Sequence, residues 1–381
     1  MQQIAFLIYP PRTLPRPRSH ALPYLYLQFI NPFIDSVRIV KTGMNYFNSH
    51  APFKLESGEE LSGITIAYHI YGQLNASAEN VIWICHALTA SSDAKAWWPG
   101  MIGDNAVFDT TKYCVICANM PGSCYGSTGP LSTDPSTVEP YFKQFPLITI
   151  RDMVRAYQLL RVHLGIKSIK LMAGGSMGGY QALEWSIMEP ALIKKLFLIA
   201  CSPKESPWGI AIHTAQRMAI EADQSFGEPS AEAGKNGLKV ARAFGMVNYR
   251  TYQSYELTQS ETDNDKSDHF RASSYITYQG LKLVNRFNAY SYWYLTKAMD
   301  SHNISRNRNK SVEEVLSSIN QNTLVMGISS DLLCPVSEQQ HMAQYIINAG
   351  YIEIESVFGH DGFLIETETI SKHLSLWLDK E

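Results

Sequence analysis

Short, nearly continuous apolar runs alternate with helical stretches from about residue 44 onward, and this alternation constrains the fold more than any other feature of the chain. Several runs lack the polar–apolar alternation of a one-sided strand, which is typical of strands covered on both faces. Strand and helix in alternation predict an α/β fold with a mostly parallel central sheet. The expected strands span 64–70, 80–85, 113–118, 168–173, 195–200, 323–328 and 351–356, and the clearest helices span 149–164, 178–190 and 337–347.

The alternation fails between residues 203 and 317, where the chain is polar, rich in tyrosine and helical in pattern. We interpret 203–317 as a helical lid inserted between two strands of a core made of 44–202 and 318–381. Residues 1–43 carry several prolines, five basic residues and one acid, without the form of a secretory signal. We expect 1–43 to be a disordered or spurious leader, and the functional chain to start near Met44.

Composition excludes several classes of protein. The 381 residues carry a formal net charge of −3, whereas a nucleic-acid surface usually needs a basic excess. No apolar run reaches the roughly 18–20 residues that span a bilayer. Cys114 and Cys117 lie three apart in an expected strand and should face opposite ways, so neither a metal site nor a disulfide is predicted for them. Buried thiols favour a reducing, cytoplasmic compartment. The histidines are dispersed, so no metal site is expected.

The segment 174–178, GGSMG, stands between an apolar run and residues that favour helix. It matches the G-x-S-x-G pattern, in which a serine occupies a turn so sharp that its neighbours must lack bulk. The start of a helix beneath the hydroxyl favours developing negative charge. We interpret Ser176 as a nucleophile. A phosphate-binding loop is the alternative, but no Gly-Lys-Ser/Thr follows.

A nucleophilic serine needs a general base, and the base needs a carboxylate that orients it. Asp331 follows the expected strand 323–328, and His360 follows the expected strand 351–356. Catalytic groups gather just past the carboxyl ends of strands in open α/β sheets. The sequence therefore predicts a triad of Ser176, Asp331 and His360.

The oxyanion of an acyl transfer needs two backbone N–H donors. The residue after the nucleophile, Met177, is expected to supply one, and the loop after an early strand the other. In the sequence HALT of that loop, Leu88 is the candidate donor. We interpret His86 as a residue that shapes the loop rather than as a second base.

Seven stretches in one order carry a more specific signal. They are HALTASSDAKAWWPG, NMPGSCYGSTGPLS, FPLITIRDMV, GGSMGGYQALEW, SPWGIAIHTAQRMAI, YQGLKLVNRFNAYSYWYLTKAMDSHN and GHDGFL. Together they resemble the homoserine O-acetyltransferase family of α/β-hydrolase-fold acyltransferases, from about Met44 to the end of the chain. The resemblance implies the α/β-hydrolase fold with an inserted helical lid.

The resemblance also implies an activity, a step of methionine biosynthesis. Ser176 would take an acetyl group from acetyl-CoA, and homoserine would then remove it in a ping-pong reaction. Acetyl-CoA is thus expected as a substrate, with no bound cofactor. The resemblance implies that Arg217 binds the acceptor carboxylate and that Asp361 binds its ammonium group. A guanidinium pairs well with a carboxylate, and a carboxylate with an ammonium group. The alternative for Arg217 is a solvent-exposed arginine on a helix, and the alternative for Asp361 is a structural hydrogen bond within its turn.

Other possibilities stay open at the level of sequence. The donor is either acetyl-CoA or succinyl-CoA, and the acceptor is either homoserine or serine. Succinyl would need another cation, and the loops 86–98 and 119–130 contain only Lys95, which favours acetyl. An esterase of the same fold would need only the triad. The resemblance implies a homodimer, and the aromatic run AYSYWYLTKAM is either its interface or part of the lid's own core.

Overall fold

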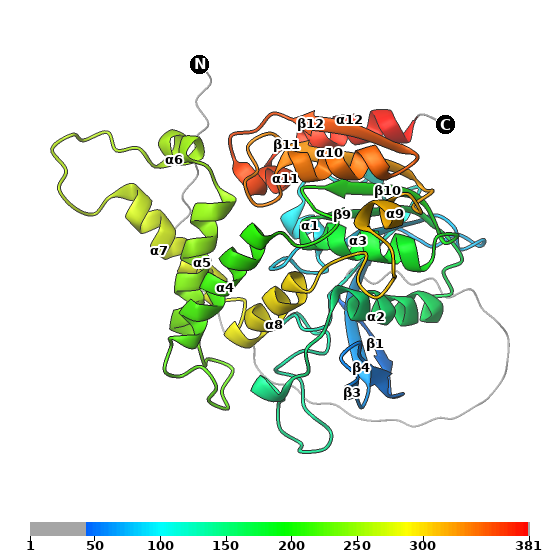
Figure 1. The fold of residues 1–381 in the computed structure, drawn as a ribbon, viewed down its shortest axis with the longest axis horizontal. Coiled ribbons are helices and arrows are strands. Elements are labelled where there is room, and N and C mark those ends of the chain that lie inside the picture. The colour runs from blue at the N-terminus through cyan, green and yellow to red at the C-terminus, as the bar shows by residue number, and fades with distance from the viewer. Residues whose placement is uncertain (1–42, 380–381) are drawn as a thin grey trace, which may run out of the picture. The chain divides into compact units, whose positions relative to one another are not determined.

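The computed structural model describes residues 43–379, and the predicted leader, apart from Gly43, lies outside them. An eight-stranded sheet runs through the core, with helices on both faces (Figure 1). Its strands are β1 (Asn45–Ser49), β4 (Ile64–Tyr71), β5 (Val81–Cys85), β8 (Cys114–Ala118), β9 (Ile169–Gly175), β10 (Ile193–Ile199), β11 (Asn322–Ile328) and β12 (Ala349–Ile354). The short pairs β2 (Phe53–Lys54) with β3 (Glu60–Leu61) and β6 (Ile102–Gly103) with β7 (Phe108–Asp109) form separate two-stranded sheets.

The strand order is β1-β4-β8-β5-β9-β10-β11-β12. From β8 to β12 all neighbouring pairs are parallel, whereas β4 runs antiparallel to β8 and to β1. All seven expected strands are present, with boundaries shifted by at most two residues. The α/β prediction is confirmed. The strand β1 was not expected, because its alternation of half-buried and exposed residues contains no apolar run.

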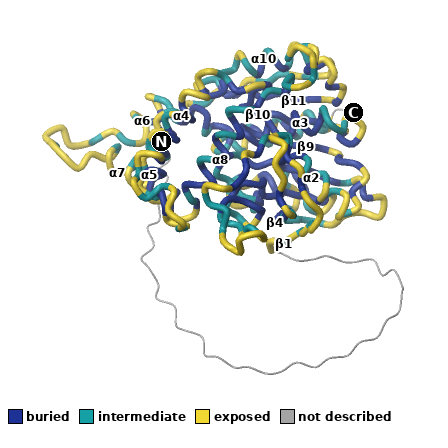
Figure 2. The backbone as a smooth tube through the Cα atoms, turned by 60° about the horizontal axis from the view of Figure 1, so that its bottom comes forward, coloured by how far each residue is buried: buried dark blue, intermediate teal, exposed yellow. Residues whose placement is uncertain are grey.

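Both faces of the sheet are covered, as the continuous apolar runs predicted. Every residue of β5 and β8 is buried. One face packs against α2 (Ile150–His163), α3 (Met177–Met188) and α10 (Val336–Tyr345), and the other against α1 (Ala94–Trp97), α11 (Gly362–Ile365) and α12 (Thr367–Leu378). Cys114 and Cys117 belong to different hydrophobic clusters on opposite faces, as expected from the strand period. Figure 2 shows the buried backbone concentrated in this sheet and its helices.

Five helices of eight or more residues lie between β10 and β11, in the interval predicted as a lid. They are α4 (Pro207–Glu221), α5 (Lys235–Tyr249), α6 (Tyr252–Gln259), α7 (Arg271–Val284) and α8 (Ala289–Asp300). A short α9 (Val312–Leu316) precedes β11. Helix α5 packs between α4 and α7, and α4 packs on α8. We call α4–α8 the cap; the exact domain boundaries stay a prediction.

Helix α8 decides between the two interpretations of the aromatic run. Tyr290, Tyr292 and Tyr294 are buried, and Trp293 packs against the core from a partly exposed position. The run therefore belongs to the packing between the cap and the core. In the described part of the chain, no helix has the length and apolar character needed to cross a membrane.

Candidate active site

Ser176 occupies the turn between β9 and α3 with φ +54° and ψ −130°. A residue other than glycine adopts such a conformation only at a cost of about 1–3 kcal/mol, so the surrounding structure must hold it there. The hydroxyl side chain lies above the sheet at the N-terminus of α3. The glycines of the GGSMG segment thus surround a strained serine, as the pattern predicts.

Two of those glycines are required by close backbone contacts. A Cβ on Gly178 would lie 2.1 Å from the carbonyl oxygen of Cys85 in β5. A Cβ on Gly174 would lie 2.3 Å from the carbonyl oxygen of Gly178. The first turn of α3 therefore packs directly on strand backbone, which brings its N-terminus under the serine.

The structure brings Ser176, His360 and Asp331 together although they lie far apart in the sequence. His360 Nε2 is 2.8 Å from Ser176 Oγ, and His360 Nδ1 is 2.7 Å from Asp331 Oδ2. Asp331 Oδ1 accepts the backbone N–H groups of Leu333 (2.8 Å) and Cys334 (2.9 Å). All three side chains of the triad are buried.

The partners of His360 determine which ring nitrogen carries the proton. The Asp331 carboxylate accepts hydrogen bonds but cannot donate, so Nδ1 is protonated and Nε2 is free to accept the Ser176 proton. Burial alone would lower the pKa of His360, but the charge of Asp331 and its hydrogen bond outweigh that effect and raise the pKa above its ordinary value of 6.5. His360 is therefore oriented as a base and stabilised once it is protonated.

A cavity of about 470 Å³ opens above Ser176 and His360, between core and cap. The core side includes Leu88, Trp97, Phe363 and Leu364, and the cap side consists of Arg242, Tyr249, Lys282, Arg286 and Met299. As the first residue of α3, Met177 has an amide with no intrahelical acceptor. The Leu88 loop borders the same space, so both predicted oxyanion donors lie near the serine.

His86 is completely buried, and both of its ring nitrogens are engaged. Nδ1 lies 2.9 Å from the carbonyl oxygen of Ala87, and Nε2 accepts the N–H of Met120 at 3.1 Å. Burial lowers the pKa of His86 to about 4. A neutral ring that joins two loops agrees with a role in shaping the oxyanion loop.

The two residues expected to bind the acceptor occupy different surroundings. Arg217, on α4, donates to Asp300 Oδ2 at 2.6 Å and to Thr214 at 3.0 Å, and it is not among the residues that line the cavity. Its Nη1 is buried without a hydrogen-bond partner. Asp361 does line the cavity, and its Oδ2 accepts from Arg250 Nε at 2.8 Å.

Sequence reasoning missed the cations that line the cavity: Arg242, Lys282 and Arg286. They come from α5 and from the end of α7. Lys282 and Arg286 lie in KLVNR, within the sixth of the seven stretches quoted above, but a helical pattern does not tell which face of a cap helix faces the sheet. That information requires the packing of α5 between α4 and α7.

Among the described residues, the group of His, Cys and acidic side chains close enough to share a metal ion is Asp331, Cys334 and His360. Both acidic oxygens and both histidine nitrogens already have hydrogen-bond partners within the triad and its loop. Burial raises the pKa of the Cys334 thiol well above its ordinary value, which disfavours the thiolate that binds metals. The group is better suited to proton transfer.

A strained serine at a strand–helix turn, hydrogen-bonded to a histidine that is paired with an aspartate, is the arrangement typical of serine-nucleophile enzymes of the α/β-hydrolase class. The family model for the α/β hydrolase fold matches residues 80–367. The homoserine O-acetyltransferase of Cyclobacterium marinum is 45% identical over 324 residues, which cover 85% of this chain and 92% of that protein. The chain therefore belongs to the homoserine O-acetyltransferase family.

Solved structures agree with this assignment. The crystal structure of homoserine O-acetyltransferase from Bacillus anthracis matches with a TM-score of 0.82 and 26% identity, over 89% of this chain and 98% of that one. The crystal structure of esterase E22 matches with a TM-score of 0.81 and 22% identity, over 88% of this chain and 100% of that one. At that identity the second likeness concerns the fold alone.

Proposed function

We propose that the protein transfers an acetyl group from acetyl-CoA to the hydroxyl of L-homoserine through an acetyl-Ser176 intermediate. The observation that carries the proposal is the hydrogen-bonded chain Ser176–His360–Asp331 at the floor of a cavity that the cap closes from above. A cap restricts access to the acyl-enzyme, which favours a second substrate over water.

The residues account for each proton. His360 Nε2 takes the Ser176 proton as Oγ attacks the thioester carbonyl, and the N–H groups of Met177 and Leu88 stabilise the oxyanion. Collapse breaks the C–S bond, and the leaving thiolate receives the proton from His360 Nε2. The homoserine hydroxyl then gives its proton to Nε2 and attacks the acetyl-serine. Ser176 leaves and takes that proton back, so the enzyme is regenerated.

Acceptor recognition is assigned to charges that line the cavity. Asp361, next to His360, is proposed to bind the ammonium group. Its Oδ2 accepts a hydrogen bond from Arg250 Nε, which fixes the carboxylate. For the carboxylate, Arg242 is a better candidate than Arg217, because Arg242 lines the cavity whereas Arg217 is paired with Asp300. Arginine suits this task because its guanidinium offers two parallel donors to a carboxylate.

The surroundings of the serine on the core side favour acetyl over succinyl. Ala96, Trp97, Phe363 and Leu364 are apolar, and no lysine or arginine between residues 43 and 379 lines the core side of the cavity. Lys95, the only basic residue in the two mouth loops, has its Nζ 5.0 Å from the centre of the Tyr71 ring instead. A succinyl carboxylate would thus have to reach across to the cap for a partner.

Release of free CoA thiol tests the proposal, with acetyl-CoA or succinyl-CoA paired with homoserine, serine or no acceptor. We expect fast release only with acetyl-CoA and homoserine together, and none above background with Ser176→Ala. A faster reaction with succinyl-CoA or serine would change the substrates and keep the mechanism. Equal release without an acceptor would make the protein a hydrolase and refute the proposal.

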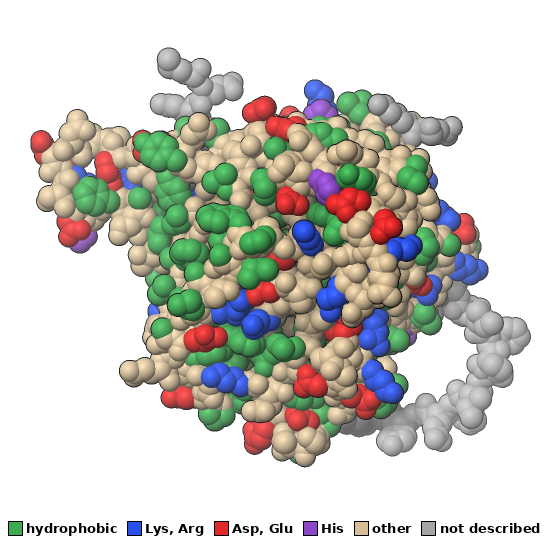
Figure 3. Space-filling model, viewed as in Figure 1, with side chains coloured by type: hydrophobic (Ala, Val, Ile, Leu, Met, Phe, Trp, Pro, Cys, Tyr) green, Lys and Arg blue, Asp and Glu red, His purple; other side chains and the backbone are tan. Residues whose placement is uncertain are grey.

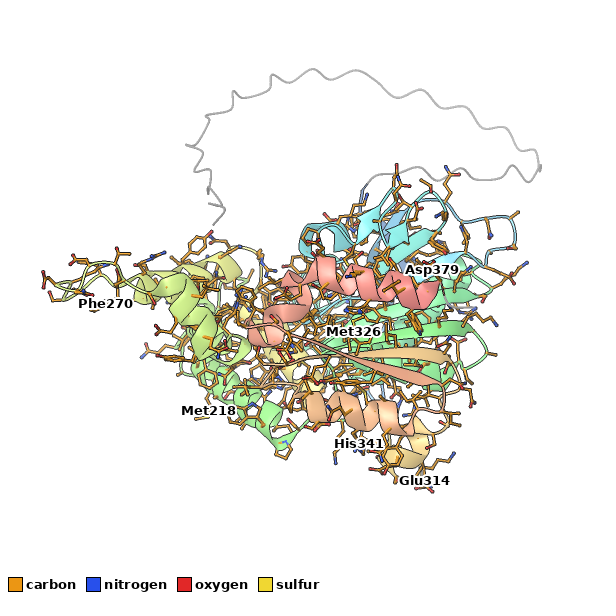
Figure 4. All side chains as sticks on the ribbon, turned by 90° about the horizontal axis from the view of Figure 1, so that it is seen from above. Met218, Phe270, Glu314, Met326, His341 and Asp379 are labelled. Carbon is orange, nitrogen blue, oxygen red and sulfur yellow. The ribbon has the colours of Figure 1, made fainter. Side chains whose placement is uncertain are left out.

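We also propose that the protein is a homodimer joined through the cap. Val240, Phe244 and Val247 on α5 and Tyr278 and Leu281 on the adjacent α7 are exposed apolar side chains. Figure 3 shows hydrophobic side chains gathered over the cap helices. Met218 and Phe270 lie on the outer side of the cap, whereas Met326 lies within the sheet (Figure 4). Patches of this kind mark interfaces.

Light scattering tests the homodimer. The parent protein should give twice the chain mass, and Phe244→Glu should give monomers. A monomeric parent protein would refute the dimer.

The compartment is proposed to be the cytoplasm. All six cysteines are free thiols, and five of them are buried. Free thiols are typical of a reducing compartment. Fractionation of cells that express the full chain would test this.

A further inference from the structure

Two cations at the mouth of the cavity have no role in the reaction as described so far. Lys282 lies in the last turn of α7, and Arg286 lies just after that helix. Both side chains line the cavity, and both residues are exposed to solvent. They therefore stand at the entrance rather than at the floor, where Ser176 is buried.

Arg286 is held in place by the core. Its Nη1 donates to the carbonyl oxygen of Thr89 and to the hydroxyl of Tyr125. The Cys124 thiol lies 3.5 Å from its backbone carbonyl oxygen. Among the described residues, its Nε and Nη2 have no hydrogen-bond acceptor. The guanidinium is thus fixed over the oxyanion loop with donors to spare.

The charges at the mouth are not balanced by the residues around them. Among the residues that the structure describes, Arg242, Lys282 and Arg286 line the cavity and Asp361 is the one acidic residue beside them, already paired with Arg250. Lys282 has no carboxylate within ion-pair distance among residues 43–379. The whole chain carries −3, so this is a local excess of positive charge. Such an excess attracts polyanions and speeds their arrival.

The acceptor does not account for this excess, because a zwitterionic amino acid carries one negative charge and Arg242 is assigned to it. The thioester donor is different. Its acyl end must reach the buried Ser176, and its nucleotide, with a pyrophosphate and a 3′-phosphate, lies at the opposite end of the molecule. Those phosphates must therefore remain near the mouth while the pantetheine arm extends inward.

We propose that Lys282 and Arg286 bind the phosphate groups of the donor's nucleotide at the entrance of the cavity. The inference rests on the proposed function. It gives the cap a role in selecting a coenzyme A thioester over a simple ester, because only the former carries phosphates. It also joins donor binding to the oxyanion loop, since Arg286 contacts Thr89 next to Leu88.

The test compares two donors that share the thioester and the pantetheine arm. Acetyl-CoA carries the phosphates, and acetylpantetheine carries none. For each enzyme we would measure kcat/KM with saturating homoserine and take the ratio of the two donors. Lys282→Gln should lower this ratio about two- to fivefold, as expected for one exposed ion pair. The double variant with Arg286→Gln should lower it by roughly tenfold or more, because a charge-assisted hydrogen bond is stronger.

Lys372→Gln is the matched control, because Lys372 is exposed on α12 and does not line the cavity. It should leave the ratio unchanged. Added salt should lower the ratio in the parent protein and have a smaller effect in the double variant, since screening weakens exposed pairs.

The possible failures are distinguishable. If the parent protein transfers acetyl from neither donor to homoserine, the proposed function is wrong. If it transfers from both and Lys282→Gln and the double variant lower both rates equally, the two residues only support the cap, and the inference is wrong. A parent protein that uses the two donors equally well would also overturn it.

Discussion

Asp331→Asn is expected to abolish catalysis while preserving the fold, and the hydrogen bonds around Asp331 explain why. Oδ1 of the aspartate accepts two backbone N–H groups, from Leu333 and Cys334, and Oδ2 accepts from His360 Nδ1. An asparagine has one acceptor oxygen and one donor NH₂ group. Whichever way the amide turns, one of these sides receives a donor where an acceptor is needed.

The energies favour one orientation. Turning the NH₂ group toward the two backbone N–H groups would leave two buried donors unsatisfied, at a cost of about 2–6 kcal/mol. Turning it toward His360 sacrifices a single hydrogen bond, which is worth about 1.5–3 kcal/mol because the acceptor was charged. The amide should therefore face His360, so that Nδ1 becomes the acceptor and Nε2 carries the proton. His360 then has no lone pair for the Ser176 hydroxyl.

We expect kcat to fall by about 10⁴, the size of effect known for a triad histidine forced into the wrong tautomer, which corresponds to about 5.4 kcal/mol. The assay is release of CoA thiol from acetyl-CoA with homoserine, beside a thermal melt that checks the fold. Asp361→Asn makes the same chemical change next to His360 and should act mainly on KM for homoserine. A variant of Asp331 that keeps more than about a tenth of the parent kcat would refute the tautomer reasoning.

Three further predictions concern pH, packing and the acceptor. The kcat/KM for acetyl-CoA should fall on the acid side with an apparent pKa above 6.5, because the pKa of His360 is raised and only its neutral form is a base. The raised pKa also stabilises the fold below pH 6.5, and this stabilisation is lost as the pH rises through the folded-state pKa, so activity and this part of the stability change in opposite directions. An acid limb of kcat/KM with an apparent pKa below 6.5 would contradict this prediction. Gly178→Ala should lower the free energy of unfolding, measured in urea, by about 3 kcal/mol, because its Cβ would lie 2.1 Å from a β5 carbonyl oxygen. Gly350→Ala is the control, because a Cβ there has nothing within 4 Å, and it should change this free energy by less than about 1 kcal/mol. Equal losses would contradict the packing argument. Arg242→Met should lower kcat/KM for homoserine by about 10- to 100-fold, because Arg242 lines the cavity. Arg217→Met should chiefly lower the melting temperature, because it leaves Asp300 without its arginine partner. The reverse pattern would show that Arg217, and not Arg242, binds the acceptor carboxylate.

Much of the fold could be predicted because the information is local. The run VIWIC at 81–85 is buried throughout, so its composition alone indicates a strand covered on both faces. The helix expected at 149–164 is present as α2, and its first turn is closed by a capping box between Thr149 and Asp152. The short pairs β2–β3 and β6–β7 have two residues per strand and leave no periodic pattern to detect.

The meeting of Ser176, Asp331 and His360 could be anticipated for a similar reason. A parallel sheet brings the carboxyl ends of its strands to one edge, so residues that directly follow different strands meet there whatever their separation in the sequence. Ser176 and His360 are 184 residues apart and lie within hydrogen-bond distance. No comparable rule predicts which side chains of the cap helices face the active site. Arg217 and Arg242 both lie on helices, and nothing in either helical pattern tells which one faces the serine.

The sequence by itself determined seven strands of the central sheet, the glycine-flanked serine turn and the three residues that meet at the carboxyl edge of the sheet, because each depends on short-range pattern and on the geometry common to parallel sheets. Only the tertiary structure decided which charges enter the cavity. Helix α5 packs between α4 and α7, which brings Arg242 and Lys282 to the cavity and leaves Arg217 paired with Asp300. The physical reason is that a helix exposes several faces of similar polarity, and long-range packing selects the one that meets the substrate.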